Sequence, residues 1–274
     1  MTEQSPFVPA LRNLELSKEK IYGPKGFRDY LKEEFGETHP NQWLVTAQYL
    51  SIQSLSHLDK ALRDENVMIF RLGKGTFALI QTENVEQFFI LDRDLAFTEE
   101  EFTPECDLSD LFPFKFMGSA EANAINLAIA SGLLKEALGL SHDSPRLAPT
   151  SGNTSYTFGI KPSRNQPNVE WIHRSGQVEI DALLFAKRND KWTLFCIEGK
   201  RGNQFGSLAK HKLFYPLLAV YNNEDFQPYR SEIEIVTVYL RCWSDEDHLK
   251  FRITECDLGG YELEDAYVSD LTPK

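Results

Sequence analysis

Four charged residues interrupt two otherwise apolar segments, VEIDALLFA (residues 178–186) and WTLFCIEGK (residues 192–200). They are Glu179, Asp181, Glu198 and Lys200. Two carboxylates brought together offer the hard oxygen ligands that a divalent cation such as Mg²⁺ prefers. A bound metal polarises a phosphoryl oxygen and lowers the pKa of its water, while a nearby lysine orients that water or stabilises the developing charge. These residue types therefore suit metal-assisted hydrolysis of a phosphodiester bond.

The spacing of the four residues predicts that they share one face of a β-hairpin. With the turn centred on Asn189-Asp190, Asp181 lies opposite Glu198, and Glu179 lies opposite Lys200. The alternation of side chains along a strand keeps all four on the same face, and a slip of one residue would separate the two carboxylates. Because facing like charges destabilise a sheet, this register calls for a cation between them.

The triplet Glu198-Gly199-Lys200 ends an apolar strand in register with Asp181. This arrangement resembles the active-site pattern of the PD-(D/E)XK nuclease superfamily, which includes many type II restriction endonucleases. It is the only acidic-x-lysine triplet in the sequence. The triplet supports the resemblance because of its position at the end of an apolar strand, in register with Asp181. The resemblance covers about residues 115–255, and Ile180 stands where the motif of the superfamily has proline.

The resemblance implies a metal-dependent DNA endonuclease of the restriction type. Asp181 and Glu198 would be metal ligands and Lys200 the catalytic lysine, with Mg²⁺ as the metal and Mn²⁺ as the alternative. It also implies a homodimer that cuts both strands, and a cognate DNA methyltransferase in the same system. The alternative from another functional class is a non-catalytic DNA-binding or regulatory protein with a degenerate nuclease fold.

Further site residues are expected around this pattern. In the superfamily a glutamate on the helix before the sheet often joins the metal site, which suggests Glu121, with Glu136 as a rival. Glu179 either joins the site or pairs with Lys200. Residues 186–215 carry seven basic and two acidic residues, which is a local excess of positive charge. The candidates for substrate binding, for which a solvated helix face is the alternative explanation, are Arg201, Gln204, Lys210, His211 and Lys212.

The elements around the motif predict the nuclease-like part of the chain, residues 113–274. Two strands, a helix and a further strand follow one another, so the last step is a crossover connection. We therefore expect an α/β core, α+β overall, with a restriction-endonuclease-like mixed sheet flanked by helices. The expected elements are a helix over 119–139 that Ser119 caps and Gly139 ends, a short strand at SYTFGI, a helix over 203–221, and strands over 233–243 and at FRITECDL.

Residues 1–112 predict a separate helical region. A helix over 24–35 has Pro24 near its start and Gly36 past its end. Two short helical patterns follow, NQWLVTAQYL and SLSHLDKALRDEN, and then VMIFRLGKGTFALIQ reads as a hairpin around Gly73-Lys74-Gly75. Three helices before a hairpin is the order of a winged helix, a DNA-binding fold, and a generic α+β cap is the alternative.

The composition and charge of the sequence limit which other classes of protein it could belong to. The 274 residues have a formal net charge of −12, which argues against nonspecific coating of nucleic acid but permits a local basic groove. The four cysteines are far apart and form no CxxC pair, so a disulfide framework or zinc site is not expected. No run of 18 apolar residues and no signal-peptide pattern occurs, so we expect no membrane association and a cytoplasmic location.

Overall fold

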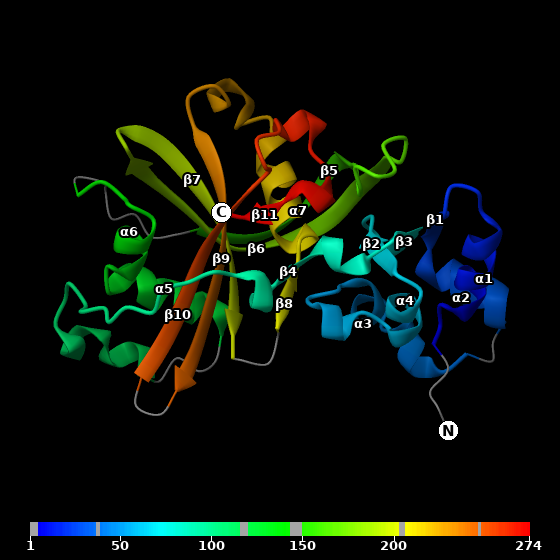
Figure 1. Cartoon of the computed structure of the whole chain (residues 1–274), viewed down its shortest axis with the longest axis horizontal. Coiled ribbons are helices and arrows are strands. Elements are labelled where there is room, and N and C mark those ends of the chain that lie inside the picture. The colour runs from blue at the N-terminus through cyan, green and yellow to red at the C-terminus, as the bar shows by residue number, and fades with distance from the viewer. Residues whose placement is uncertain (1–4, 37–38, 116–119, 143–149, 203–205, 246–247) are drawn as a thin grey trace.

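A six-stranded sheet with the order β11-β10-β9-β7-β6-β5 lies at the centre of the structure, a computed structural model of the chain (Figure 1). The structure describes residues 5–36, 39–115, 120–142, 150–202, 206–245 and 248–274. Neighbouring strands are antiparallel except β7 and β9, which are parallel, so the predicted α+β architecture with a mixed sheet is confirmed. The strands are β5 (Thr150–Ile160), β6 (Trp171–Arg188), β7 (Lys191–Arg201), β9 (Glu234–Asp245), β10 (His248–Asp257) and β11 (Thr272–Pro273).

The β6–β7 hairpin has the register that the sequence predicts. The ladder runs from Arg188 opposite Lys191 to Ala182 opposite Ile197. At the turn, Asn189 and Asp190 have φ angles of 51° and 62°. Two successive residues with positive φ form the turn type whose twist matches that of the two strands, and asparagine and aspartate tolerate this conformation better than most residues.

A crossover through helix α7 (His211–Tyr221) connects β7 to the parallel strand β9, which confirms the predicted order of strand, helix and strand. The helix is shorter than the predicted 203–221, because residues 207–209 form strand β8 (Ser207–Ala209). This strand pairs with β4 (Phe89–Leu91) from the first half of the chain. The predicted strands at SYTFGI and FRITECDL lie within β5 and β10.

Helices cover both faces of the sheet, with α7 on one face and α5 (Glu121–Ala130) and α6 (Leu133–Ala137) on the other (Figure 1). The predicted single helix over 119–139 is therefore wrong in one respect, since Gly132, with a φ of 86°, separates α5 from α6. Ser119 lies outside the described residues. Ala120 occupies the N-cap position and makes no side-chain capping bond.

The N-terminal region contains a second sheet with the order β1-β3-β2. The predicted hairpin is confirmed as β2 and β3, but the helix predicted from residue 24 begins only at Phe27. Pro24 instead belongs to β1, which pairs with β3, so tertiary pairing overrides the local helix signal. The elements are β1 (Ile21–Gly26), β2 (Val67–Arg71), β3 (Thr76–Gln81), α1 (Val8–Leu16), α2 (Phe27–Phe35), α3 (Thr46–Leu50) and α4 (Lys60–Asp64).

One apolar core contains residues from both the N-terminal region and the α7 face of the central sheet. Phe70 of β2 packs against Trp171 of β6 with ring centroids 5.6 Å apart. The Arg174 N–H donates to the Leu72 carbonyl, and a Cβ on Gly73 would lie 2.5 Å from the Arg174 carbonyl oxygen. Glycine at position 73 thus permits this close approach of the two backbones. The domain boundary after residue 112 and the winged-helix interpretation stay predictions.

Short 3-10 helices complete the connections. In the described part of the chain, no helix is long and apolar enough to cross a membrane. The 3-10 helices are η1 (Asn41–Leu44), η2 (Leu55–His57), η3 (Val85–Phe88), η4 (Asp92–Asp94), η5 (Leu108–Lys115), η6 (Gln227–Tyr229), η7 (Leu263–Asp265) and η8 (Val268–Asp270).

Candidate active site

The charged end of the β6–β7 hairpin is the point where the two strands part. Their ladder ends at Ala182 and Ile197, and beyond it β6 pairs with β5 while β7 pairs with β9. Across the opening, the Gly199 N–H donates to Oδ2 of Asp181 at 2.9 Å. Glu198 acts electrostatically on Asp181, which shows that the two carboxylates are neighbours. The structure therefore brings Asp181 and Glu198 together just beyond the last paired residues of the two strands.

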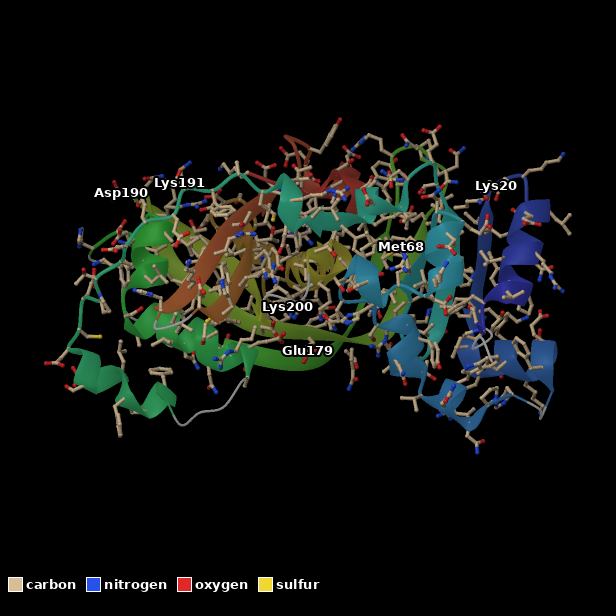
Figure 2. The ribbon with its side chains drawn as sticks, turned by 60° about the horizontal axis from the view of Figure 1, so that its bottom comes forward. Lys20, Met68, Glu179, Asp190, Lys191 and Lys200 are labelled. Carbon is tan, nitrogen blue, oxygen red and sulfur yellow. The ribbon has the colours of Figure 1, made fainter. Side chains whose placement is uncertain are left out.

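Lys200 lies at the centre of this group. Its Nζ donates to Glu198 Oε1 at 2.8 Å, to Glu121 Oε1 at 2.9 Å and to the Gly199 carbonyl at 2.8 Å. The side chain is only 6% exposed. Figure 2 shows Lys200 and Glu179 near the middle of the molecule, well away from the hairpin tip at Asp190. Two glutamates from different elements thus fix the position of the ammonium group.

Glu121 reaches Lys200 because helix α5 packs closely on β7 at a glycine. A Cβ added to Gly199 would lie 3.1 Å from Ile125 Cδ1 and 3.4 Å from Glu121 Cβ. The middle residue of the Glu198-Gly199-Lys200 triplet therefore allows the first turn of α5 to rest on the strand. Glu136, the rival of Glu121, is exposed on α6 and makes no described contact with this group.

Helix α7 contributes a second lysine, on the face of the sheet from which Glu198 and Lys200 project. The Nζ of Lys212 lies 3.3 Å from Glu198 Oε1 and 3.9 Å from Glu179 Oε2. Glu179 itself is 66% exposed and pairs in register with Asn153 of β5. The expectation that Glu179 lies opposite Lys200 is wrong, because the β6–β7 ladder ends at Ala182 and Ile197, and Glu179 pairs with β5 on the side of β6 away from β7.

The surroundings shift the pKa values of Asp181 and Lys200 upward. Burial and the neighbouring Glu198 raise the pKa of Asp181 to about 7, against smaller opposing effects of Lys200 and the Gly199 N–H. Burial by itself would lower the pKa of Lys200, but Glu198 and Glu121 outweigh it and hold the pKa above its ordinary value. At neutral pH, Lys200 is charged and Asp181 is near its titration midpoint, so a cation nearby would favour the ionised carboxylate.

The donor set fits a hard divalent cation. Glu198 is 2% exposed, and within the described residues its Oε2 atom has no hydrogen-bond partner. A buried carboxylate oxygen without a partner is costly, and a metal ion that prefers oxygen ligands would satisfy it. Asp181 would supply the second carboxylate. The described residues contain no group of three or more His, Cys, Asp and Glu side chains placed to hold a metal, so water or substrate oxygens would complete the coordination.

The other residues predicted to bind substrate lie in different places. Lys210 is buried and donates to the Ser269 carbonyl at 2.8 Å. His211 is also buried, beside the rings of Phe70 and Tyr215, and burial lowers its pKa to about 3. Their contacts are those of core residues, and Lys212 alone of these three successive residues reaches the carboxylates. Arg201 follows Lys200 at the partly exposed end of β7, and Gln204 lies outside the described residues.

Two residues of β9 that the sequence did not suggest lie beside the site. Tyr239 is in register with Glu198, and Arg241 is in register with Lys200, so both project from the same face of the sheet. Tyr239 is fully buried, and among the described residues its hydroxyl has no hydrogen-bond partner. The only sequence signal is the alternation of polar residues in VTVYLRCW, and it acquires meaning once the parallel pairing of β7 and β9 is known.

Comparison with known proteins gives a family for this chain. No curated protein and no solved structure matches it. A family model described as a domain of unknown function, DUF6997, matches residues 99–262. The matched range includes Glu121, Asp181, Glu198, Lys200 and Lys212. Because the match covers more than half of the sequence, the chain belongs to the DUF6997 family.

Proposed function

We propose that this protein is a Mg²⁺-dependent nuclease that hydrolyses phosphodiester bonds in DNA, with a restriction-endonuclease-like fold. The observation that carries the proposal is the meeting of Asp181, Glu198 and Lys200 where β6 and β7 part. A buried glutamate and lysine beside a half-buried aspartate have little value as a purely structural device, because each charge removed from water is costly to desolvate. The parallel β7–β9 crossover agrees with the fold that the sequence resemblance implies.

In this proposal Asp181 and Glu198 hold the metal, which would polarise a phosphate oxygen and lower the pKa of the attacking water. Lys200 stays protonated, because Glu198 and Glu121 keep its pKa above the ordinary value. It therefore acts as a fixed cation that stabilises negative charge on the phosphate rather than as a general base. Glu121 positions Lys200 by holding Nζ from the α5 side.

Asp181 sets the condition under which the site becomes active. With a pKa of about 7, its carboxylate is partly protonated in the metal-free protein near neutral pH. Metal binding requires the ionised form, so binding releases a proton from this residue. Lys212, which lies 3.3 Å from Glu198, would share that carboxylate with the metal, and its other acidic neighbour is Glu179 at 3.9 Å.

A second candidate function is a non-catalytic DNA-binding or regulatory protein with a degenerate nuclease site. One observation favours it: Lys200 and Lys212 already balance the charge of Glu198 without any metal. In that case the cluster would be a structural ion-pair network.

The experiment that tests the proposal is incubation of supercoiled plasmid with the purified protein in Mg²⁺ and in EDTA. Asp181→Asn, purified in parallel, controls for contaminating nucleases, and Asp190→Asn at the exposed hairpin tip is the matched control. Cleavage by the wild type and Asp190→Asn, lost in EDTA and in Asp181→Asn, supports the nuclease. Retention of plasmid on a gel without cleavage supports the second candidate. Equal cleavage by wild type and Asp181→Asn contradicts the proposed site.

A further inference from the structure

Three basic residues form a row across the sheet beside the candidate active site. Lys200 of β7 is in register with Arg241 of β9, and Arg241 is in register with Arg252 of β10. Residues in register on neighbouring strands project from the same face, so the three cations lie side by side on the α7 face. Glu198 and Glu121 neutralise Lys200. The two arginines need an anion of their own, because like charges directly opposite destabilise a sheet.

Asp92 supplies that anion from a different part of the chain. It follows β4, in the segment that runs across β9 and β10 in Figure 1. Its Oδ2 atom forms an ion pair with Arg241 Nη1 and lies 3.8 Å from Arg252 Nη1. Among the described residues, Asp92 is the one carboxylate in ion-pair contact with either arginine. One carboxylate thus serves two guanidinium groups.

The polar atoms of this cluster are incompletely satisfied. In the part of the chain that the structure describes, Arg241 Nε, Arg252 Nε and Asp92 Oδ1 are buried without a hydrogen-bond partner. Arg241 is only 5% exposed, and its other contact is the Gly202 carbonyl at 3.0 Å from Nη2. Two N–H donors and one carboxylate oxygen are left unused side by side, so the shape of Asp92 does not match the two guanidinium groups. A phosphate has acceptor oxygens pointing in several directions and carries the matching negative charge.

We propose that Arg241 and Arg252 form a binding subsite for a backbone phosphate of the nucleic acid, and that Asp92 fills this subsite until the phosphate displaces it. This inference rests on the proposed function and adds the path of the substrate across the sheet. Adjacent strands are about 4.8 Å apart, so Arg252 lies about 10 Å along the row from Lys200. That distance is the rise of about three nucleotides at about 3.4 Å each, which fits a polynucleotide strand better than a mononucleotide.

The first test measures binding of a short single-stranded DNA oligonucleotide in EDTA, where no metal-dependent cleavage occurs. Asp92→Asn keeps the size of the side chain and removes its charge, so we expect binding about tenfold tighter than in the wild type. Glu99→Gln is the matched control, since Glu99 lies on the same segment and pairs with Lys250 at 2.8 Å on the surface. This control should bind as the wild type does. An oligonucleotide of the same sequence with an uncharged methylphosphonate backbone should bind to the wild type and to Asp92→Asn with equal affinity.

The second test removes one arginine at the rim of the subsite. With the same single-stranded oligonucleotide, Arg252→Met should weaken binding about tenfold and reduce the slope of log affinity against log salt by about 0.7, the value for one phosphate contact in a single strand. Lys250→Met, which removes a positive charge from the same strand, is the control and should leave the slope unchanged. Thermal unfolding of each variant establishes that it is folded.

Binding and cleavage separate this inference from the nuclease proposal. Tighter binding by Asp92→Asn with weaker binding by Arg252→Met supports the subsite even if plasmid is never cut. If Asp92→Asn binds no more tightly than the wild type and unfolds at a lower temperature, Asp92 is a structural ion-pair partner and the subsite is rejected, whatever the outcome of the cleavage assay.

Discussion

The two ends of the β6–β7 hairpin share one register but have opposite characters. At the turn end the ladder is unbroken, the rings of Phe185 and Trp192 stack with centroids 4.6 Å apart, and Arg188 forms a 2.5 Å ion pair with Glu255 of β10. At the other end the ladder stops and Asp181 accepts a hydrogen bond from the Gly199 backbone. The ion pair at the first end is partly exposed, with 13% and 20% of its side chains accessible, whereas Glu198 and Lys200 at the second end are buried together.

The difference shows where in a sheet a cluster of reactive side chains can form. A continuous ladder uses every backbone donor and acceptor and places side chains at fixed positions above the sheet. Where the two strands part, backbone groups become free to bind side chains, and a helix can approach the gap, as α5 does with Glu121. The basic residues of the window 186–215 divide accordingly, because Lys187 and Arg188 belong to the turn end and Lys200 and Lys212 to the opening.

The largest expected effect is at the opening, the end of the hairpin at which β6 and β7 stop pairing. Asp181→Asn should reduce Mg²⁺-dependent cleavage by about 10³-fold or more, because it removes one of the two proposed carboxylate ligands of the metal. Metal-free thermal stability should hold or rise, since the substitution relieves repulsion with Glu198 and keeps an acceptor for the Gly199 N–H. Plasmid cleavage and thermal unfolding in EDTA measure the two effects. A large loss of stability with cleavage retained would assign the opening to structure.

The next effect separates the lysine from the metal ligands. Lys200→Met should reduce cleavage by about 10²-fold to 10³-fold, because a fixed cation near the phosphate is lost. Calorimetric titration should still detect Mg²⁺ binding, with equal or higher affinity, because Glu198 loses a competing cation. Lys191→Met at the hairpin tip is the matched control and should cleave as the wild type does. Wild-type cleavage by Lys200→Met would remove the lysine from the mechanism.

The pH dependence of stability distinguishes the two ends without any substrate. The folded protein raises the pKa of Asp181 from 3.8 to about 7, so it binds this proton more tightly than the unfolded chain does. The resulting stability is fully present below about pH 4 and is lost as the pH rises through about 7, by at most about 4 kcal/mol. Urea unfolding in EDTA at pH 5 and pH 8 should show this loss in the wild type and not in Asp181→Asn.

Mg²⁺ should oppose that loss. Because the metal binds the ionised carboxylate, added Mg²⁺ should stabilise the wild type more at pH 8 than at pH 5. Equal stabilisation at both pH values would show that Asp181 is not a ligand.

The smallest expected effect is at the turn end. Asp190 has a φ of 62°, a conformation that glycine adopts without strain, so Asp190→Gly should change the free energy of unfolding by less than about 1 kcal/mol, and Asp190→Val should lower it by about 1–2 kcal/mol. Neither should alter cleavage per folded molecule. A loss of cleavage in Asp190→Gly at unchanged stability would mean that the two ends of the hairpin are coupled.

The sequence alone determined the parts of this protein that depend on neighbours along the chain. The apolar alternation and the Asn189-Asp190 turn established the register of the hairpin, because a slip of one residue would place the apolar side chains on the wrong face. The order of strand, helix and strand likewise predicted the parallel pairing of β7 with β9. That register, continued past Ala182 and Ile197, placed Asp181 beside Glu198, but it wrongly placed Glu179 opposite Lys200.

Only the tertiary structure decided which other side chains join them. Successive residues on a helix point about 100° apart, so which of Lys210, His211 and Lys212 faces the carboxylates depends on how α7 packs on the sheet. Arg241 and Asp92 meet although about 150 residues separate them, which no local pattern encodes. Local periodicity specifies each element and its faces, whereas contacts between elements are determined by the burial of apolar surface over the whole chain.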